Sequence, residues 1–240
     1  MLKIENLTKK YGNFTALKNL TLTVNAGEIF GFIGHNGAGK STAIRSIVGI
    51  QTFDGGSIFI DDKNVLSQSI EAKKVTAYLP DNPDIYEFLS GKGYLTFIAE
   101  MYDMESADAE AQIKKYTELF GIADVLSSSV STYSHGMRQK LAICGALIHR
   151  PRLVVMDEPF VGLDPVAAHH LKETMRELCK EGVSFFFSTH VLEVAEKLCD
   201  RVAIIKQGEL LVCGNMQEVL QDKSLEELFL SLSEKTGEEK

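Results

Sequence analysis

The chain has 240 residues, of which 45% are hydrophobic and 24% charged, a composition typical of a globular protein. Its formal net charge of −8, from 33 acidic and 25 basic residues, argues against direct binding to nucleic acid or to an anionic membrane surface. The four cysteines are well separated and the amino-terminal residues contain no apolar leader, so we expect reduced thiols, no insertion into a membrane and a location in the cytoplasm.

The amino-terminal segment predicts antiparallel β structure. Apolar and polar residues alternate over 2–8 and 17–33, with turn-forming residues at 11–13 and 25–27. The last six residues of this stretch, 28–33, are mostly apolar and predict a buried strand.

A complete phosphate loop follows that strand. Residues 34–42 match the pattern G-x-x-x-x-G-K-[ST], and a helix is predicted to begin at its end. Glycines let backbone N–H groups approach a polyphosphate, Lys40 can reach the β- and γ-phosphates, and the Ser41 hydroxyl can bind Mg²⁺. The positive end of the following helix points at the same phosphates. The sequence therefore predicts nucleotide binding by Gly34, His35, Asn36, Gly37, Ala38, Gly39, Lys40, Ser41 and Thr42.

Further strands at 57–60 and 75–80 are followed by a helical region. From about residue 88 to residue 149, apolar residues recur at spacings of three and four, with polar stretches between them. We interpret this region as a helical subdomain of about residues 82–149, inserted into an otherwise α/β protein.

An acidic pair ends the next apolar run, residues 153–156. Such a continuous run is typical of a parallel strand that is buried on both faces. Asp157 is then placed to hold Mg²⁺, and Glu158 to orient or deprotonate the water that attacks the γ-phosphate. His190 ends another predicted strand, 183–188, where an imidazole could contact the γ-phosphate.

The remaining segments predict a helix, a hairpin and a short final helix. Asp164 and Pro165 form an amino-terminal cap for a helix that ends near Gly182. Residues 201–212 predict a hairpin, apolar residues within 225–232 predict an amphipathic helix, and 233–240 predict a polar tail.

Taken in this order, the motifs resemble those of the ATP-binding subunit of an ATP-binding cassette (ABC) transporter. In that family, residues 34–42 correspond to the Walker A loop, Asp157 and Glu158 to the Walker B aspartate and the catalytic glutamate, and 162–164 to the D-loop. The resemblance implies that Tyr11 stacks on adenine and that Lys40, Glu158 and His190 are catalytic. Residues 133–140 correspond to the family signature, so Ser134 and Gly136 are expected to bind the ATP of a partner subunit.

The same resemblance implies a fold. We expect a phosphate-loop NTPase (RecA-like) core with an amino-terminal antiparallel β subdomain and the inserted helical subdomain, all in one ABC ATPase domain of residues 1–232. The core and the β subdomain would occupy about 1–80 and 150–214, with the carboxyl-terminal hairpin and helix at 201–232.

Two departures from the family pattern are visible. The signature has His135 in place of a glycine and Met137 in place of a glutamine, and Asp81 stands where the family has the glutamine of its Q-loop. Asp81 still carries a ligating oxygen and is a third candidate ligand for Mg²⁺, beside Ser41 and Asp157. These variants resemble the branch that exports drugs or bacteriocins with an ABC-2-type permease.

The family implies a head-to-tail homodimer or heterodimer around two ATP molecules, which powers transport through a separate membrane permease. The permease would dock near Asp81–Leu95, and the subunit would lie peripherally on the cytoplasmic face of the membrane. The alternative is a soluble ABC-type ATPase that acts in a cytosolic assembly, nucleic-acid or ribosome process. Such proteins usually add a long coiled coil, a second cassette or zinc-binding cysteines, and this sequence shows none of them.

Overall fold

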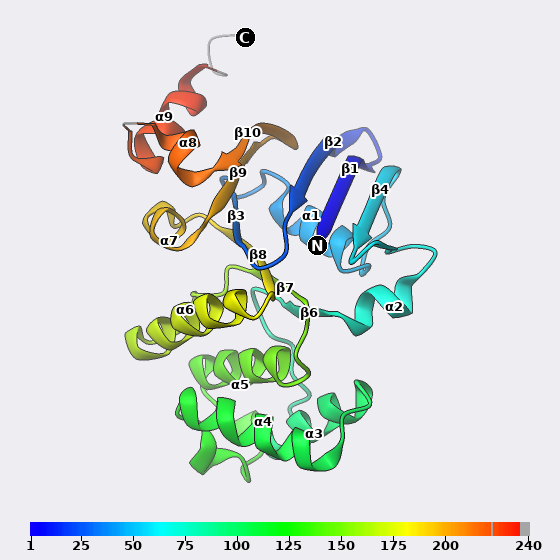
Figure 1. The fold of residues 1–240 in the computed structure, drawn as a ribbon, viewed down its shortest axis with the longest axis vertical. Coiled ribbons are helices and arrows are strands. Elements are labelled where there is room, and N and C mark those ends of the chain that lie inside the picture. Colours follow the sequence, from blue (N-terminus) through cyan, green and yellow to red (C-terminus); the bar gives the residue numbers. More distant parts are fainter. Residues whose placement is uncertain (222, 236–240) are drawn as a thin grey trace.

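The computed structural model describes residues 1–221 and 223–235 and contains two β-sheets (Figure 1). The smaller sheet has the strand order β2-β1-β4-β5 and its pairs are antiparallel. The larger sheet has the order β10-β9-β3-β8-β7-β6, and all of its pairs except β9–β10 are parallel. The strands are β1 (Leu2–Tyr11), β2 (Phe14–Val24), β3 (Ile29–Ile33), β4 (Gly55–Ile60), β5 (Lys63–Asn64), β6 (Thr76–Leu79), β7 (Leu153–Asp157), β8 (Ser184–Thr189), β9 (Arg201–Lys206) and β10 (Glu209–Asn215).

The α/β class is confirmed, but the prediction for 17–33 is wrong in part. Residues 14–24 do form an antiparallel strand, whereas β3 leaves that sheet and pairs in parallel with β8 and β9. The physical reason lies in burial. Every residue of β3 is buried, as a strand covered on both faces requires, whereas alternate residues of β2 face solvent.

Both faces of the larger sheet are covered. Along β8, Phe185 and Phe187 pack into one hydrophobic cluster and Phe186 packs into the other. The first cluster joins the sheet to helices of the carboxyl-terminal two thirds of the chain, and the second joins it to the smaller sheet and to α1. The period of two along a strand thus supplies an apolar side chain to each layer.

Helices connect and cover these strands. The expected helical region lies at the far end of the molecule from the smaller sheet and comprises α3, α4 and α5 (Figure 1). Its first helix begins at Gly91, so residues 80–90 form a loop at the start of the predicted subdomain. The helices are α1 (Lys40–Ile47), α2 (Ser69–Lys74), α3 (Gly91–Met101), α4 (Ser106–Leu119), α5 (His135–Ile148), α6 (Pro165–Lys180), α7 (Leu192–Leu198), α8 (Met216–Leu220) and α9 (Leu225–Lys235).

The carboxyl-terminal predictions are confirmed over the described residues. Asp164 caps α6 with Pro165 in its first turn, and β9 and β10 form the expected hairpin. Helix α9 continues to Lys235, so the polar tail predicted from residue 233 begins within the helix. The rest of that tail, residues 236–240, lies outside the described residues.

Candidate functional site

The candidate site lies where parallel strands of the larger sheet end. In space the strands run β3-β8-β7-β6, and their carboxyl ends lead respectively to the phosphate loop, to His190, to Asp157 with Glu158, and to Asp81. The carboxyl edge of a parallel sheet is where ligands bind in open α/β folds.

The phosphate loop, the acidic pair and Asp81 line a cavity of about 320 Å³, and His190 is not among its lining residues. Most of the predicted nucleotide-binding residues line it, but Gly34 and Ala38 do not. Phe14 and Ala16 also line the cavity, and neither was predicted from the sequence. The lining residues are Tyr11, Phe14, Ala16, His35, Asn36, Gly37, Gly39, Lys40, Ser41, Thr42, Asp81, Asp157 and Glu158.

The phosphate loop requires glycine because other backbone lies against it. A Cβ at Gly34 would stand 2.5 Å from the Ile205 carbonyl oxygen. A Cβ at Gly39, where φ is +108°, would stand 2.8 Å from the carbonyl oxygen of Ala16. Both positions therefore exclude any side chain, and the loop takes the tight turn that leads into α1.

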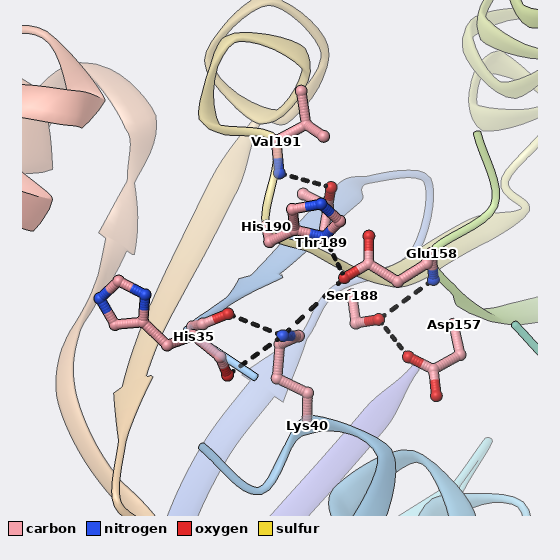
Figure 2. A network of polar contacts seen from close by, with 9 residues as sticks. His35, Lys40, Asp157, Glu158, Ser188, Thr189, His190 and Val191 are labelled. Carbon is pink, nitrogen blue, oxygen red and sulfur yellow. Dashed lines mark hydrogen bonds and ion pairs between the residues drawn. The ribbon is translucent and has the colours of Figure 1, made fainter. Parts of the chain in front are cut away.

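Lys40 is held inside this loop. Its side chain is 7% exposed, and its Nζ donates to the carbonyl oxygens of Gly34 at 2.7 Å and His35 at 3.3 Å. Burial lowers the pKa of Lys40, and the neighbouring carboxylates of Glu158 and Asp157 act in the opposite direction. Nζ also lies 3.8 Å from Glu158 Oε1, so the ammonium faces the acidic pair across the cavity (Figure 2).

The acidic pair is joined to the end of β8. His190 Nδ1 lies 2.9 Å from Glu158 Oε1, which confirms that the structure brings these two predicted residues together. Ser188 Oγ donates to Asp157 Oδ1, and the Glu158 N–H donates to Ser188 Oγ at 3.2 Å (Figure 2). Ser188 was not singled out in the sequence, although a hydroxyl next to an apolar run of phenylalanines is a signal that could have found it.

Asp81 and Tyr11 lie at the rim. Burial, with the carboxylates of Asp157 and Glu158 nearby, raises the pKa of Asp81, and the neighbouring His135 and His190 oppose this. Tyr11 is 50% exposed, and its hydroxyl donates to Gln51 Oε1 at 2.6 Å. Its ring is therefore anchored at the open side of the cavity.

The predicted signature residues lie outside this cavity. The Ser134 side chain accepts from the Met137 N–H at 3.3 Å and so caps α5. Ser134 and Gly136 do not line the cavity. The His135 ring between them lies against Gly162 of the predicted D-loop, where an added Cβ on Gly162 would stand 2.6 Å from the ring.

A contact from the carboxyl-terminal helix was not predicted. The Phe229 ring of α9 lies 4.6 Å, centroid to centroid, from the imidazole of His35 in the phosphate loop. Nearly 200 residues separate the two rings in the sequence, and neither residue type signals the other. Across the described residues, no helix is long and apolar enough to span a membrane.

Comparison with known proteins places these features in a family. Residues 17–161 match the family model of the ABC transporter. The chain is 34% identical over 219 residues to the linearmycin resistance ATP-binding protein LnrL of Bacillus subtilis (strain 168), covering 91% of this chain and 70% of that protein. It is 35% identical over 238 residues to the ABC-type transporter ATP-binding protein EcsA of the same organism, covering 97% and 96%. A solved ATP-binding subunit of an ABC transporter superimposes with a TM-score of 0.94 at 33% identity, covering 97% of this chain and 99% of that one.

Proposed function

The chain belongs to the ABC transporter family as an ATP-binding subunit, the ATPase that powers transport, and we propose that its ATP occupies the cavity between the phosphate loop and Glu158. One observation carries this proposal. A single cavity of about 320 Å³ is lined by Lys40, Ser41 and the acidic pair, although these come from distant parts of the sequence. The Tyr11 ring at the rim would stack on the adenine, and the loop from Gly34 to Thr42 would bind the phosphates.

The donor set of the cavity fits Mg²⁺. This ion prefers oxygen ligands and is usually bound in nucleotide sites by one or two protein groups together with phosphates and waters. The Ser41 hydroxyl and the carboxylates of Asp157 and Asp81 all line the cavity. We propose these residues as its ligands, and the bound ion would neutralise charge on the phosphate oxygens.

We propose that Glu158 orients and deprotonates the attacking water. Its side chain is 12% exposed and is held by His190, so the carboxylate has a fixed direction into the cavity. Lys40 would move from the carbonyl oxygens of its own loop to the phosphates and stabilise their charge there. His190 would contact the γ-phosphate while it positions Glu158.

The exposed amino-terminal end of α5 supports a head-to-tail dimer, either homodimer or heterodimer. Ser134 and His135 are exposed, and a helix amino terminus attracts anions. These residues lie outside the ATP cavity of their own subunit, so we propose that Ser134 and Gly136 bind the ATP of a partner subunit.

The segment Asp81–Leu95 is the proposed docking site for the permease. Here Phe88 is 81% exposed and Tyr86 is 52% exposed, and their rings lie 5.7 Å apart. Exposed aromatic residues that cluster in this way are typical of protein interfaces. With a permease bound there, the subunit would lie on the cytoplasmic face of the membrane, and the similarity to a linearmycin resistance protein favours export of a drug or bacteriocin.

The substitution Glu158→Gln tests the catalytic assignment. We expect the variant to bind an ATP analogue and to form the dimer, with turnover lowered by about 100-fold or more because the general base is lost. Glu193→Gln is the matched control, since that glutamate side chain is 78% exposed on α7. Steady-state hydrolysis within about twofold of the wild-type rate in Glu158→Gln would contradict the assignment.

The permease proposal is tested with the same variant. Tagged Glu158→Gln protein, extracted from its own cells in ATP and mild detergent, should copurify with a stoichiometric multi-span membrane protein. The substitution Phe88→Ser should reduce that recovery and leave ATP binding unchanged. Recovery of Glu158→Gln with cytosolic proteins alone would contradict a permease partner and favour the soluble ATPase.

A further inference from the structure

Ser188 lies at the point where the two acidic residues of the site meet β8. It is fully buried, and in the parallel pairing of β7 with β8 it stands directly opposite Asp157. A hydroxyl can donate one hydrogen bond and accept others. Ser188 donates to Asp157, the last residue of β7, and accepts from Glu158, the residue that follows it.

The donated hydrogen bond fixes the carboxylate of Asp157. The Ser188 hydroxyl donates to Oδ1 of that carboxylate, and Asp157 is itself only 5% exposed (Figure 2). A carboxylate held at one oxygen cannot rotate freely about its last bond. Oδ2 is thereby left for a ligand in the cavity that Asp157 lines.

The accepted hydrogen bond fixes the backbone of Glu158. The Glu158 N–H donates to Ser188 Oγ and to the Ser188 carbonyl oxygen, each at 3.2 Å. Glu158 has φ of +49°, in the left-handed region that a residue with a Cβ rarely adopts. Such a conformation persists only where the surroundings hold it. Here Ser188 accepts both hydrogen bonds from the Glu158 N–H, and the Val161 N–H donates to the Glu158 carbonyl oxygen at 3.1 Å.

We propose that Ser188 is the positioning residue of this site: its single hydroxyl orients the Asp157 carboxylate toward the metal ion and holds Glu158 in the conformation that directs its carboxylate at the attacking water. This inference rests on the proposed function. It adds a residue that touches neither the nucleotide nor the metal but acts through both acidic side chains.

The same strand offers a matched control. Ser184 is also fully buried on β8, and its hydroxyl also makes a donated and an accepted hydrogen bond, to the Asn25 carbonyl oxygen at 2.9 Å and from the Gly27 N–H at 3.1 Å. It stands at the opposite end of the strand from the site. Ser184→Ala therefore removes an equivalent buried hydroxyl without touching the acidic pair.

The experiment compares Ser188→Ala, Ser188→Thr and Ser184→Ala with the wild-type protein. Mn²⁺ binding in the presence of a non-hydrolysable ATP analogue is followed by electron paramagnetic resonance, alongside thermal melting and the separate kcat and KM values for ATP. Loss of an outer-shell partner of a metal ligand typically weakens metal binding by about 10–100-fold. We expect Ser188→Ala to raise the Mn²⁺ dissociation constant by about tenfold and to lower kcat more than it raises KM.

Both controls should separate positioning from folding. Ser184→Ala should melt earlier yet keep Mn²⁺ affinity within about twofold of wild type, and Ser188→Thr should recover much of the affinity because it keeps the hydroxyl. If Ser188→Ala does not fold, Ser188→Cys is added in its place, and we expect its Mn²⁺ affinity to be lower than that of Ser188→Thr; equal affinities of these two variants would overturn the inference. Unchanged Mn²⁺ affinity in folded Ser188→Ala, or equal weakening in Ser184→Ala, would overturn the inference alone. A wild-type protein that binds no Mn²⁺–nucleotide would overturn the proposed function and the inference with it.

Discussion

Asp164 connects two helices through its two carboxylate oxygens. Oδ1 accepts from the Ala167 N–H at 2.9 Å and caps α6, while Oδ2 lies 2.6 Å from the Lys140 Nζ of α5. The bond to Lys140, followed by the bond to the Ala167 backbone, lowers the pKa of Asp164 from 3.8 to about 2. Two substitutions separate these contacts. Asp164→Asn keeps the capping oxygen and removes the ion pair, and Asp164→Ala removes both.

The expected costs follow from the geometry. A helix cap contributes about 0.5–2 kcal/mol to the free energy of unfolding. The Asp164 side chain is 48% exposed, so its ion pair is screened by water and contributes about 0.2–1 kcal/mol. We therefore expect Asp164→Asn to cost about 0.2–1 kcal/mol and Asp164→Ala about 1–3 kcal/mol. In a protein of this size, each kcal/mol lowers Tm by about 2–4 °C.

Salt and pH distinguish the two contributions. In thermal melts, about 1 M salt should remove most of the difference between wild type and Asp164→Asn, because it screens exposed charges, and should preserve the difference between Asp164→Asn and Asp164→Ala. Because folding lowers the pKa of Asp164, its ionic stabilisation is present above pH 3.8 and is lost as the pH falls toward 2. Equal Tm values for the Asn and Ala variants at both salt concentrations would refute the capping argument.

Three further outcomes are expected. Lys40→Met should weaken binding of a fluorescent ATP analogue by about 10–100-fold, measured by anisotropy, because it removes a charge-assisted contact to phosphate; unchanged affinity would contradict the phosphate assignment. Tyr11→Ala should weaken the same binding by about fivefold or more and Tyr11→Phe by less than about twofold, since stacking needs the ring and not the hydroxyl. Phe186→Ala should lower the free energy of unfolding by about 3–5 kcal/mol in urea denaturation, because this ring is fully buried and packs against two others. Its centroid lies 5.7 Å from that of the Phe30 ring and 5.3 Å from that of the Phe32 ring.

The sequence predicted local structure better than it predicted strand partners. The turn at 25–27, the cap at Asp164 and the hairpin of β9 and β10 each depend on residues that are close together in the chain, and the structure confirms them. The pairing of β3 with β8 joins residues more than 150 positions apart, and the first residues of the two paired segments are apolar in both strands. The residues of an apolar strand do not specify which apolar strand will pair with it, and for this reason the sequence does not distinguish a parallel partner for β3 from the antiparallel sheet.

In the candidate site, too, the sequence predicted local motifs better than contacts between distant residues. Its individual motifs were found because each needs particular residue types, namely glycines for the loop and acids after a buried strand. Two contacts to those motifs were missed, Ser188 on Asp157 and Phe229 on His35, because each joins residues that lie far apart in the sequence. The register of β7 with β8 and the packing of α9 assign them to the site.

The strand order explains why His190 and Glu158 act on one another. Along the chain, the phosphate loop is followed by Asp81, then by the acidic pair and last by His190, so His190 is the most distant of these from Lys40. In the sheet, β8 lies between β3 and β7, and the end of β8 therefore stands between the loop and the acidic pair. His190 therefore lies next to both the phosphate loop and the acidic pair. From the same end of β8, Ser188 contacts Asp157 and His190 contacts Glu158. A displacement of β8 would accordingly disturb both acidic residues together.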